Sequence, residues 1–394
     1  MRTRAVALGL LATLTMAGCS SGSDSKPSPR TENAVRSIDV RKAVPLKVGT
    51  DLEVVAELPR KHGKRDVYYT GFTDDGKILG SMAEPEPPSD KIPSPTTTQG
   101  YPFIYDLDTE KFTILDEADR PEVSGVGELV SSGDTIAWME GQGNAIDTSE
   151  FTVRSFDRTT GAVRDLATFD DPEGQIVYGN DLVLHRGVAY FSTPDYSNRK
   201  TGTPAVYSVP VDGSEPAKVL AEGMRVELQG DTLTYSDDGT RYARDLATDS
   251  TSKAWTSSHA DERGFCRATR TETFETWCIG TPIGDPGPDQ SIDLPVLTIK
   301  GRSGRTAVLK GFPSDDNFPL PQDIEAYGPW ISMVVTGGDW PAPQYLFDLE
   351  SGTLRQLPTD HMLRPVSPDG TRAILNEVAG EGSAPQRVVE IPKP

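Results

Sequence analysis

A short turn motif recurs along this chain and constrains its fold more than any other feature. Three sharp copies share an aromatic lead-in, an aspartate and a following apolar run: Tyr105–Leu115, Phe156–Leu166 and Phe347–Leu357. Three looser copies occur at Val209–Gly213, Asp245–Asp249 and Lys300–Gly304. Asp, Ser/Thr and Gly favour tight turns, and the flanking aromatic and β-branched residues favour strands. Each copy is therefore predicted to be the turn between two antiparallel strands.

A second predicted strand pair precedes several copies. Examples are Asp66–Leu79, Gly127–Trp138 and Leu182–Phe191. Each unit then has four short strands in about 40–50 residues, which is the period of a propeller blade. No run of three helical turns with caps interrupts this pattern. The sequence predicts an all-β fold, a single β-propeller.

The blade count follows from the chain ends. After the sixth turn motif, Met362–Val378 supplies two strands and Arg387–Ile391 a third, so the last blade lacks a fourth. The unassigned strand Leu52–Leu58 is predicted to complete that blade and to close the ring, which removes exposed edges. Seven four-stranded blades result, with eight as the alternative. In the fourth blade, Ser236–Thr240 is predicted to join the second and third strands.

Two segments carry a resemblance to a known family. Ser367-Pro-Asp-Gly-Thr-Arg-Ala-Ile-Leu375 and Leu346-Phe-Asp-Leu-Glu-Ser-Gly352 resemble the TolB-like and WD-repeat-like β-propellers, and the similarity covers most of residues 64–391. Proteins of this family have many unrelated functions, so the resemblance implies a fold and no activity. The Ser367–Thr371 segment is interpreted as a turn, and its serine is not a nucleophile candidate.

The N-terminus resembles a bacterial lipoprotein leader. Arg2 and Arg4 precede an apolar run, Ala5–Ala17, that is too short to span a bilayer, and small residues lead into Cys19. The resemblance implies cleavage before Cys19 and a lipid on its sulfur, with the protein on the extracytoplasmic face of the cell membrane. An ordinary secretory signal is the alternative. The predicted organisation is a signal peptide over 1–18, a lipidated cysteine and flexible tether over 19–37, and the propeller over 38–394.

The charge limits the possible partners. Loss of Arg2 and Arg4 with the leader takes the formal charge from −20 to −22. Such a charge disfavours nucleic acid and anionic lipid surfaces and favours solubility. We expect a monomer whose partners are the membrane, through the anchor, and an envelope protein or a small ligand.

Two cysteines remain besides Cys19. Cys266 and Cys278 flank a segment with aromatic residues beside each cysteine, Phe265 and Trp277, as expected for a hairpin stapled by a disulfide. Closing a loop of this size stabilises by about 3 kcal/mol in the chain-entropy model. A catalytic or metal-binding thiol is the alternative reading.

The long irregular segments are predicted to be second-to-third strand connections at one end of the channel, where binding residues concentrate on a rigid scaffold. These segments are Glu84–Gly100, Gly141–Ser149, Thr193–Pro204, Thr281–Leu294 and Thr336–Pro343. Candidate ligand-binding residues there are Tyr101, Asp195, Tyr196, Arg199, Asp285, Asp289, Asp339 and Trp340. Ordinary solvent-facing loop residues are the alternative for each of them.

Enzymatic signatures are scarce. The sequence has no G-x-S-x-G, and its four histidines (His62, His185, His259 and His361) have no paired metal-ligand spacing. No glycine-rich phosphate loop opens a helix, so no cofactor and no metal are predicted. Carboxylate pairs from different blades stay open, because their spacing in sequence carries no information. We therefore expect a binding or interaction module that uses the long-loop face. The alternative is a propeller hydrolase or lyase, acting on cell-envelope carbohydrate or a lactone with a carboxylate or metal site at the channel mouth.

Overall fold

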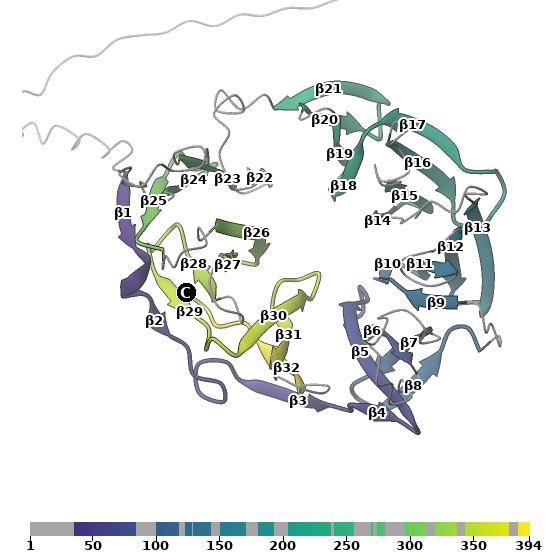
Figure 1. Ribbon diagram of the computed structural model, residues 1–394, viewed down its shortest axis with the longest axis horizontal. Helices are drawn as coiled ribbons and strands as arrows, with labels where there is room; N and C mark the ends of the chain where they lie inside the picture. The colour runs from purple at the N-terminus through teal and green to yellow at the C-terminus, as the bar shows by residue number, and fades with distance from the viewer. Residues whose placement is uncertain are drawn as a thin grey trace, which may run out of the picture. The chain divides into compact units, whose positions relative to one another are not determined.

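The chain forms a seven-bladed β-propeller (Figure 1). The computed structural model describes residues 35–83, 100–117, 123–127, 129–142, 150–170, 180–192, 204–237, 240–255, 269–270, 274–279, 296–312, 320–336, 343–377 and 385–394. Within these ranges the one helix is a single 3₁₀ turn, Val40–Lys42, and none is long and apolar enough to cross a membrane. The prediction of seven blades in an all-β fold is confirmed.

The first four blades follow one another along the chain. Blade 1 contains β4 (Lys61–His62), β5 (Arg65–Phe72), β6 (Ile78–Ala83), β7 (Gly100–Asp106) and β8 (Lys111–Ile114). Blade 2 contains β9 (Val123–Val126), β10 (Val130–Ser132), β11 (Thr135–Gln142), β12 (Glu150–Asp157) and β13 (Ala162–Asp170). Blade 3 contains β14 (Asn180–His185), β15 (Val188–Ser192), β16 (Ala205–Pro210) and β17 (Lys218–Glu222). Blade 4 contains β18 (Met224–Gln229), β19 (Thr232–Asp237), β20 (Thr240–Asp245) and β21 (Ser250–Trp255).

The last three blades each include a strand from the N-terminal segment. Blade 5 contains β22 (Thr269–Arg270), β23 (Phe274–Ile279), β24 (Val296–Gly301), β25 (Thr306–Lys310) and β1 (Arg36–Asp39). Blade 6 contains β26 (Leu320–Tyr327), β27 (Trp330–Thr336), β28 (Gln344–Phe347), β29 (Leu354–Gln356) and β2 (Val44–Pro45). Blade 7 contains β30 (His361–Val366), β31 (Arg372–Glu377), β32 (Gln386–Glu390) and β3 (Val54–Leu58).

The predicted ring closure is confirmed. Strand β3 pairs antiparallel with β32, with Val54 opposite Val389 and Leu58 opposite Gln386. The sequence did not predict the two strands before it: β1 pairs parallel with β25 and β2 pairs parallel with β29, each as a fifth, outer strand. The N-terminal segment therefore runs along the outer edges of three successive blades (Figure 1).

The repeated aspartate turns form because the aspartate carboxylate accepts hydrogen bonds from two backbone amides of the turn. Asp106 accepts hydrogen bonds from the amides of Asp108 and Thr109 at 3.1 and 3.0 Å. The same pair of bonds recurs at Asp157, Asp245 and Asp348. Such a side-chain turn needs no partner from elsewhere in the fold, which is why it marks the repeat in the sequence.

The core lies between neighbouring blades. One cluster joins blade 7 to blade 1 through Leu58, Phe103, Ile374 and Val388, all buried. Another joins blade 6 to blade 7 and includes Leu52, which precedes the closing strand. The clusters lie between adjacent sheets around a central opening, which is bordered by the innermost strands, such as β5, β14, β18 and β30 (Figure 1).

Candidate functional site

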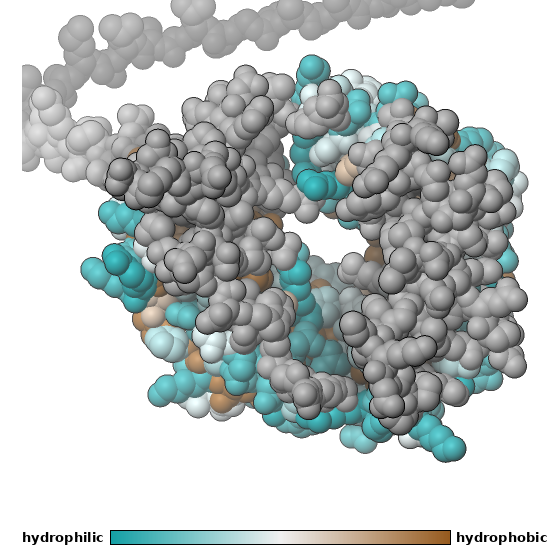
Figure 2. Space-filling model, viewed as in Figure 1, coloured by the Kyte–Doolittle hydropathy of each residue, from teal (hydrophilic) through white to brown (hydrophobic). Residues whose placement is uncertain are grey.

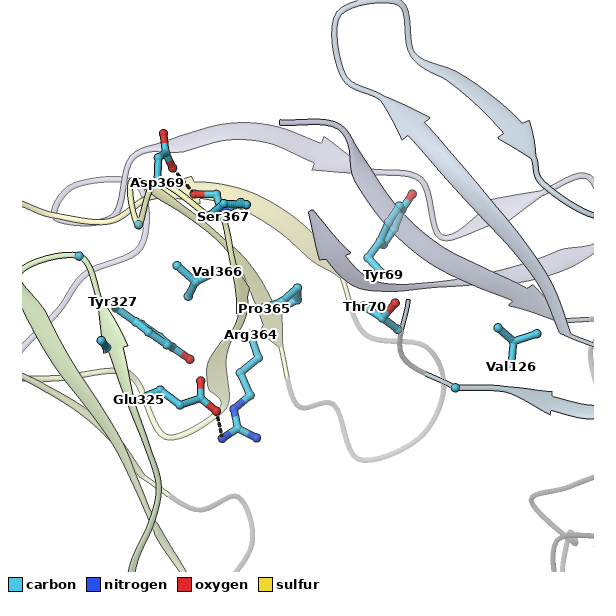
Figure 3. Close-up of a pocket in the computed structure, with 15 residues that line it drawn as sticks. Tyr69, Thr70, Val126, Glu325, Tyr327, Arg364, Pro365, Val366, Ser367 and Asp369 are labelled. Carbon is cyan, nitrogen blue, oxygen red and sulfur yellow. Dashed lines mark hydrogen bonds and ion pairs between the residues drawn. The ribbon is translucent and has the colours of Figure 1, made fainter. Parts of the chain in front are cut away.

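A pocket of ≈ 830 Å³ lies where the innermost strands of blades 6, 7 and 1 meet β9 of blade 2 (Figure 3). Its lining includes Thr70 of β5, Glu325 of β26 and Arg364 of β30. The tight turns at Gly328 and Ser367–Gly370 also line it, so the pocket lies at the tight-turn end of the channel. Its volume is in the range of small-molecule sites. In Figure 2 the described surface in the lower part of the central opening is mostly hydrophilic.

The wall formed by blade 1 carries a buried hydroxyl. The ladder between β5 and β6 shifts register between Tyr69 and Gly71, so Thr70 is an extra residue in the innermost strand. Its Oγ1 atom is buried, and among the described residues it has no hydrogen-bond partner. A buried unsatisfied hydroxyl is costly and is normally explained by a partner such as water or a ligand. Thr70 is therefore a polar residue of the pocket wall whose buried hydroxyl has no partner among the described residues.

The opposite wall carries a pair of charges. Arg364 Nη2 lies 3.3 Å from Glu325 Oε1, and the two side chains are 33 % and 50 % exposed. The guanidinium lies beside the Glu325 carboxylate, and Thr70 lies on a different strand (Figure 3). A long, solvent-accessible ion pair contributes little to stability. The Arg364–Glu325 pair is therefore a polar feature of this wall and a minor contribution to stability.

Two tyrosines form aromatic walls. Burial raises the pKa of Tyr69 and of Tyr327 far above the ordinary range of a phenol. Each hydroxyl donates a hydrogen bond at 2.8 Å, from Tyr69 to the Pro59 carbonyl and from Tyr327 to the Leu363 carbonyl. Both phenols therefore stay neutral and fixed, and they supply shape and no acid–base function.

The turn between β30 and β31 forms the rim of the pocket. Ser367 Oγ donates to Asp369 Oδ1 at 2.6 Å, and the hydroxyl accepts from the amide of Arg372 at 2.9 Å. The hydrogen bond from the Ser367 hydroxyl is the chief reason why the pKa of Asp369 is lowered. None of the described residues that line the pocket is a histidine, and the Ser367 hydroxyl is held by these bonds within the turn. The interpretation of this segment as a turn is confirmed.

Two glycines hold the rim together. Gly328 and Gly370, in turns of adjacent blades, have φ of 58° and 68°, where glycine is favoured. A β carbon on Gly328 would lie 2.9 Å from the Gly370 carbonyl, and one on Gly370 would lie 2.7 Å from the Gly328 nitrogen. Glycine at both positions therefore lets blades 6 and 7 touch beside the pocket.

Most of the predicted site residues lie outside the described residues. These are Cys19, Asp195, Tyr196, Arg199, Cys266, Asp285, Asp289, Asp339 and Trp340. Tyr101 is described: it is 7 % exposed, in β7, with Arg65 Cζ 3.6 Å from its ring centroid. Cys278 lies in β23 opposite Leu297. The lipidation, the disulfide and the loop-face site stay predictions.

The structure confirms the predicted placement of the long segments as second-to-third strand connections, for example between β6 and β7 and between β11 and β12. Among the described residues, no group of three or more His, Cys, Asp or Glu side chains is arranged to hold a metal ion. The enzyme alternative gains no support from this part of the chain.

The residues of the channel pocket were missed by sequence reasoning. A signal was present: Thr70 stands three residues before Thr73-Asp-Asp-Gly76, and Arg364 stands three residues before Ser367-Pro-Asp-Gly370. The two turns share their hydrogen bonds, since Thr73 Oγ1 donates to Asp75 Oδ1 at 2.6 Å as Ser367 does to Asp369. Thr70 and Arg364 are thus equivalent positions of blades 1 and 7.

Comparison with known proteins found similar solved structures and no similar sequence. No protein-family model and no curated protein sequence matches the chain. TolB from Acinetobacter baumannii shares 12 % identity at a TM-score of 0.35, covering 91 % of this chain and 94 % of that one. The β-propeller domain of the trilobed protease from Pyrococcus furiosus shares 9 % identity at a TM-score of 0.47, covering 83 % and 98 %.

A third similar structure is the acylaminoacyl peptidase from Pyrococcus horikoshii, with 11 % identity and a TM-score of 0.48. The match covers 84 % of this chain and 53 % of the peptidase. At such identities the similarity describes the fold alone, which is shared by binding modules and by enzymes. The chain is a β-propeller structurally similar to these proteins.

Proposed function

We propose that this protein is a binding module that holds a small polar ligand in the channel pocket. The observation that carries the proposal is the cavity itself: a volume of ≈ 830 Å³ lined by four blades, with a buried unpartnered hydroxyl at Thr70 on one wall. An apolar ligand would leave that hydroxyl without a partner and would exclude water from the Arg364–Glu325 ion pair, which favours a polar ligand.

The pocket can be blocked from one exposed position. Ala326 lies in β26, lines the pocket and is exposed. Ala326→Trp places an indole in the cavity at a strand position that tolerates aromatic residues. Val219→Trp is the matched control, because Val219 is 61 % exposed on β17, the outer strand of blade 3.

Ligand-detected NMR with a panel of sugars, amino acids, amines and carboxylates tests the proposal. We expect at least one class to bind the wild-type protein and the Val219→Trp variant, and not to bind Ala326→Trp. Binding that persists in Ala326→Trp, or no binding by any class, would refute the pocket as the functional site.

The module is further proposed to be a lipoprotein anchored outside the cytoplasm through Cys19. The support is the sequence of the leader, with its apolar run followed by small residues and the cysteine. Mass spectrometry of membrane-extracted protein should show cleavage before Cys19 and a mass increase for the lipid. A Cys19→Ser variant that remains in the membrane fraction would contradict the anchor.

An envelope protein is proposed as a second partner at the opposite end of the channel. The support is that the five long segments predicted to carry the site each join a second strand to a third, which places their attachment points at one end of the ring. Replacing residues 85–95 with a Gly/Ser linker should abolish crosslinking to that partner in intact cells. Unchanged crosslinks would contradict this assignment.

A further inference from the structure

The innermost strand of blade 7 is irregular where it lines the channel pocket. In the ladder between β30 and β31, two residues of β30, Arg364 and Pro365, stand opposite the single residue Ile374. Both residues of β30 line the pocket. Proline has no amide hydrogen, and a bulge interrupts the ladder of main-chain hydrogen bonds. The main chain at this point therefore needs hydrogen-bond partners other than the neighbouring strand.

Side chains from two blades supply these partners. From blade 6, the Tyr327 hydroxyl and the Gln344 Nε2 atom donate to the Leu363 carbonyl at 2.8 and 3.2 Å. Within blade 7, Asn376 Nδ2 donates to the Arg364 carbonyl at 2.6 Å. Two successive carbonyls of β30 are thus held by side chains, directly beside the pocket.

The orientation of the Asn376 amide is set by the next strand. Gln386, on β32, faces Asn376 in the ladder, and its Nε2 atom donates a hydrogen bond to Asn376 Oδ1. An asparagine amide accepts at its oxygen and donates at its nitrogen. Because Gln386 binds the oxygen, the nitrogen is directed at the Arg364 carbonyl. Half a turn of the Asn376 amide would instead place its oxygen against that carbonyl oxygen.

This row of amides begins at the closing strand. Gln386 faces Leu58 of β3, and the adjacent pair is joined by a bond from Arg387 Nε to Glu57 Oε1 at 2.8 Å. Leu58 is buried in the cluster that joins blades 7 and 1. Cross-strand neighbours on one face of a sheet contact one another directly. Leu58, Gln386 and Asn376 therefore form a continuous row across blade 7, from its outer strand to the strand beside the pocket.

We propose that Asn376 and Gln386 are positioning residues of the channel pocket, and that the N-terminal strand β3 sets the pocket wall through them. The proposal rests on the pocket function above and deepens it, because both amides act on the pocket through the main chain of Arg364. Coupling of this kind is carried by contiguous hydrogen bonds and packed side chains. A displacement of β3 removes the neighbour of Gln386, frees the Asn376 amide to rotate and releases the Arg364 carbonyl.

Reaction with phenylglyoxal measures this coupling without a pocket ligand. Phenylglyoxal modifies accessible guanidinium groups, and peptide mass spectrometry of the folded, full-length protein gives the modification rate of each arginine. Arg364 reports on the pocket wall. Arg186, whose side chain is 67 % exposed in blade 3, is the internal reference. The measured quantity is the ratio of the Arg364 rate to the Arg186 rate.

Two variants break the row of amides. Asn376→Leu removes the donor to the Arg364 carbonyl, and Gln386→Leu removes the donor to Asn376. The matched control is Thr152→Val, because Thr152 Oγ1 forms a cross-strand hydrogen bond of 3.2 Å with Thr168 Oγ1 in blade 2.

We expect the rate ratio to rise about threefold or more in Asn376→Leu and in Gln386→Leu, which is the size of one lost hydrogen bond. The ratio should keep its wild-type value in Thr152→Val. A merely structural role would expose both arginines together through global unfolding and leave the ratio unchanged. A ratio that is unchanged or lower in both amide variants overturns the positioning role.

Leu58→Ala tests the link to the closing strand. It should raise the ratio about twofold or more when Asn376 is present, and it should add nothing in the Asn376→Leu background. Leu58→Val, which leaves a smaller cavity, repeats the test at a lower cost in stability. Val55→Ala, at a 41 % exposed position of β3, is the control and should leave the ratio unchanged. Wild-type ratios in both Leu58 variants overturn the role of β3.

The outcomes separate this proposal from the pocket function. Unchanged ratios in Asn376→Leu and Gln386→Leu overturn the positioning role and leave the binding test with Ala326→Trp unaffected. Ligand binding that survives Ala326→Trp overturns the pocket function, and with it any role of the two amides in positioning a ligand, whatever the ratios are.

Discussion

The side-chain amide of Gln344, in β28 of blade 6, binds the main chain of Leu363, in β30 of blade 7. Gln344 Oε1 accepts from the Leu363 amide at 2.7 Å, and its Nε2 donates to the Leu363 carbonyl at 3.2 Å. Nε2 also donates to Ser332 Oγ at 2.8 Å. Leu363 immediately precedes Arg364, so a completely buried amide positions one wall of the channel pocket.

Replacing Gln344 with leucine should destabilise the protein by about 2–3 kcal/mol. The change leaves the Leu363 amide buried without its acceptor and Ser332 without its donor, and each unsatisfied group costs about 1–3 kcal/mol. Urea denaturation measures the change in the free energy of unfolding. Gln356→Leu, at a half-buried position of β29, is the control and should change it by less than about 0.5 kcal/mol. Equal effects of the two variants would contradict the role of Gln344.

Arg154 should be the most sensitive charged residue of blade 2. Its side chain is 8 % exposed and lies within 3.0 Å of carboxylate oxygens of both Asp116 and Glu140. Glu140 also accepts from the indole of Trp138 at 2.9 Å. Arg154→Met leaves buried carboxylates without their cation and should cost about 3–5 kcal/mol.

Two comparisons check this prediction by urea denaturation. Arg154→Met/Glu140→Gln should recover part of the loss, because one of the uncompensated charges is removed. Arg186→Met removes an exposed arginine that pairs with Asp231 and should cost at most about 1 kcal/mol. An Arg154→Met variant no less stable than Arg186→Met would show that the buried cluster is dispensable.

The tight-turn face should lose stability in acid. Two hydrogen bonds from Arg158 to Asp75, at 3.0 and 2.7 Å, are the main reason why the pKa of Asp75 is lowered from 3.8 to about 2. A group whose pKa is lower in the folded state stabilises the protein above its unfolded pKa, and this contribution is lost as the pH falls through the folded pKa. The contribution of Asp75 should therefore disappear between about pH 4 and pH 2.

Urea midpoints at pH 6, 4 and 3 test this prediction. The midpoint of Asp75→Asn should fall less steeply between pH 4 and pH 3 than that of the wild type. The difference should be modest, because Asp75 is 47 % exposed and solvent screens the pair. Asp108→Asn, at an exposed turn position of blade 1, should keep the wild-type slope. If the urea midpoint of Asp75→Asn fell with pH as steeply as that of the wild type, the contribution assigned to the Asp75–Arg158 pair would be contradicted.

Ring closure should depend on Leu52. This side chain is completely buried in the cluster that joins blades 6 and 7, just before the closing strand β3. Leu52→Ala should cost about 2–5 kcal/mol, from lost burial and the cavity that remains. Val55→Ala, at a 41 % exposed position of β3, should cost well under half as much. Similar unfolding free energies for the two variants would contradict the closure role.

The blade repeat was predictable because its turns are local. An aspartate that accepts from amides two and three residues ahead needs no distant partner, so Asp106 and Asp348 identify their turns from sequence. The closing strand was predictable because the sequence predicts three strands for the last blade and leaves Leu52–Leu58 unassigned. By contrast, Arg36–Asp39 pairs with a strand some 270 residues away, and its sequence has no strong strand pattern.

The channel pocket was not predictable in the same way. A one-residue register shift depends on the partner strand and leaves only a polar–apolar pair in the sequence, as at Arg364-Pro365. The sequence instead favours the long connections, whose candidate residues other than Tyr101 lie outside the described residues. The Thr73 and Ser367 turns carried the missed signal, since the residue three positions before each of them lines the pocket.

A crystal structure of the protein with its best-binding probe is the most direct test of the central claim. The account predicts electron density for the probe in the channel pocket, within hydrogen-bond distance of the Arg364 guanidinium. Probe density among the long connections at the other end of the channel, with the pocket filled only by water, would contradict it.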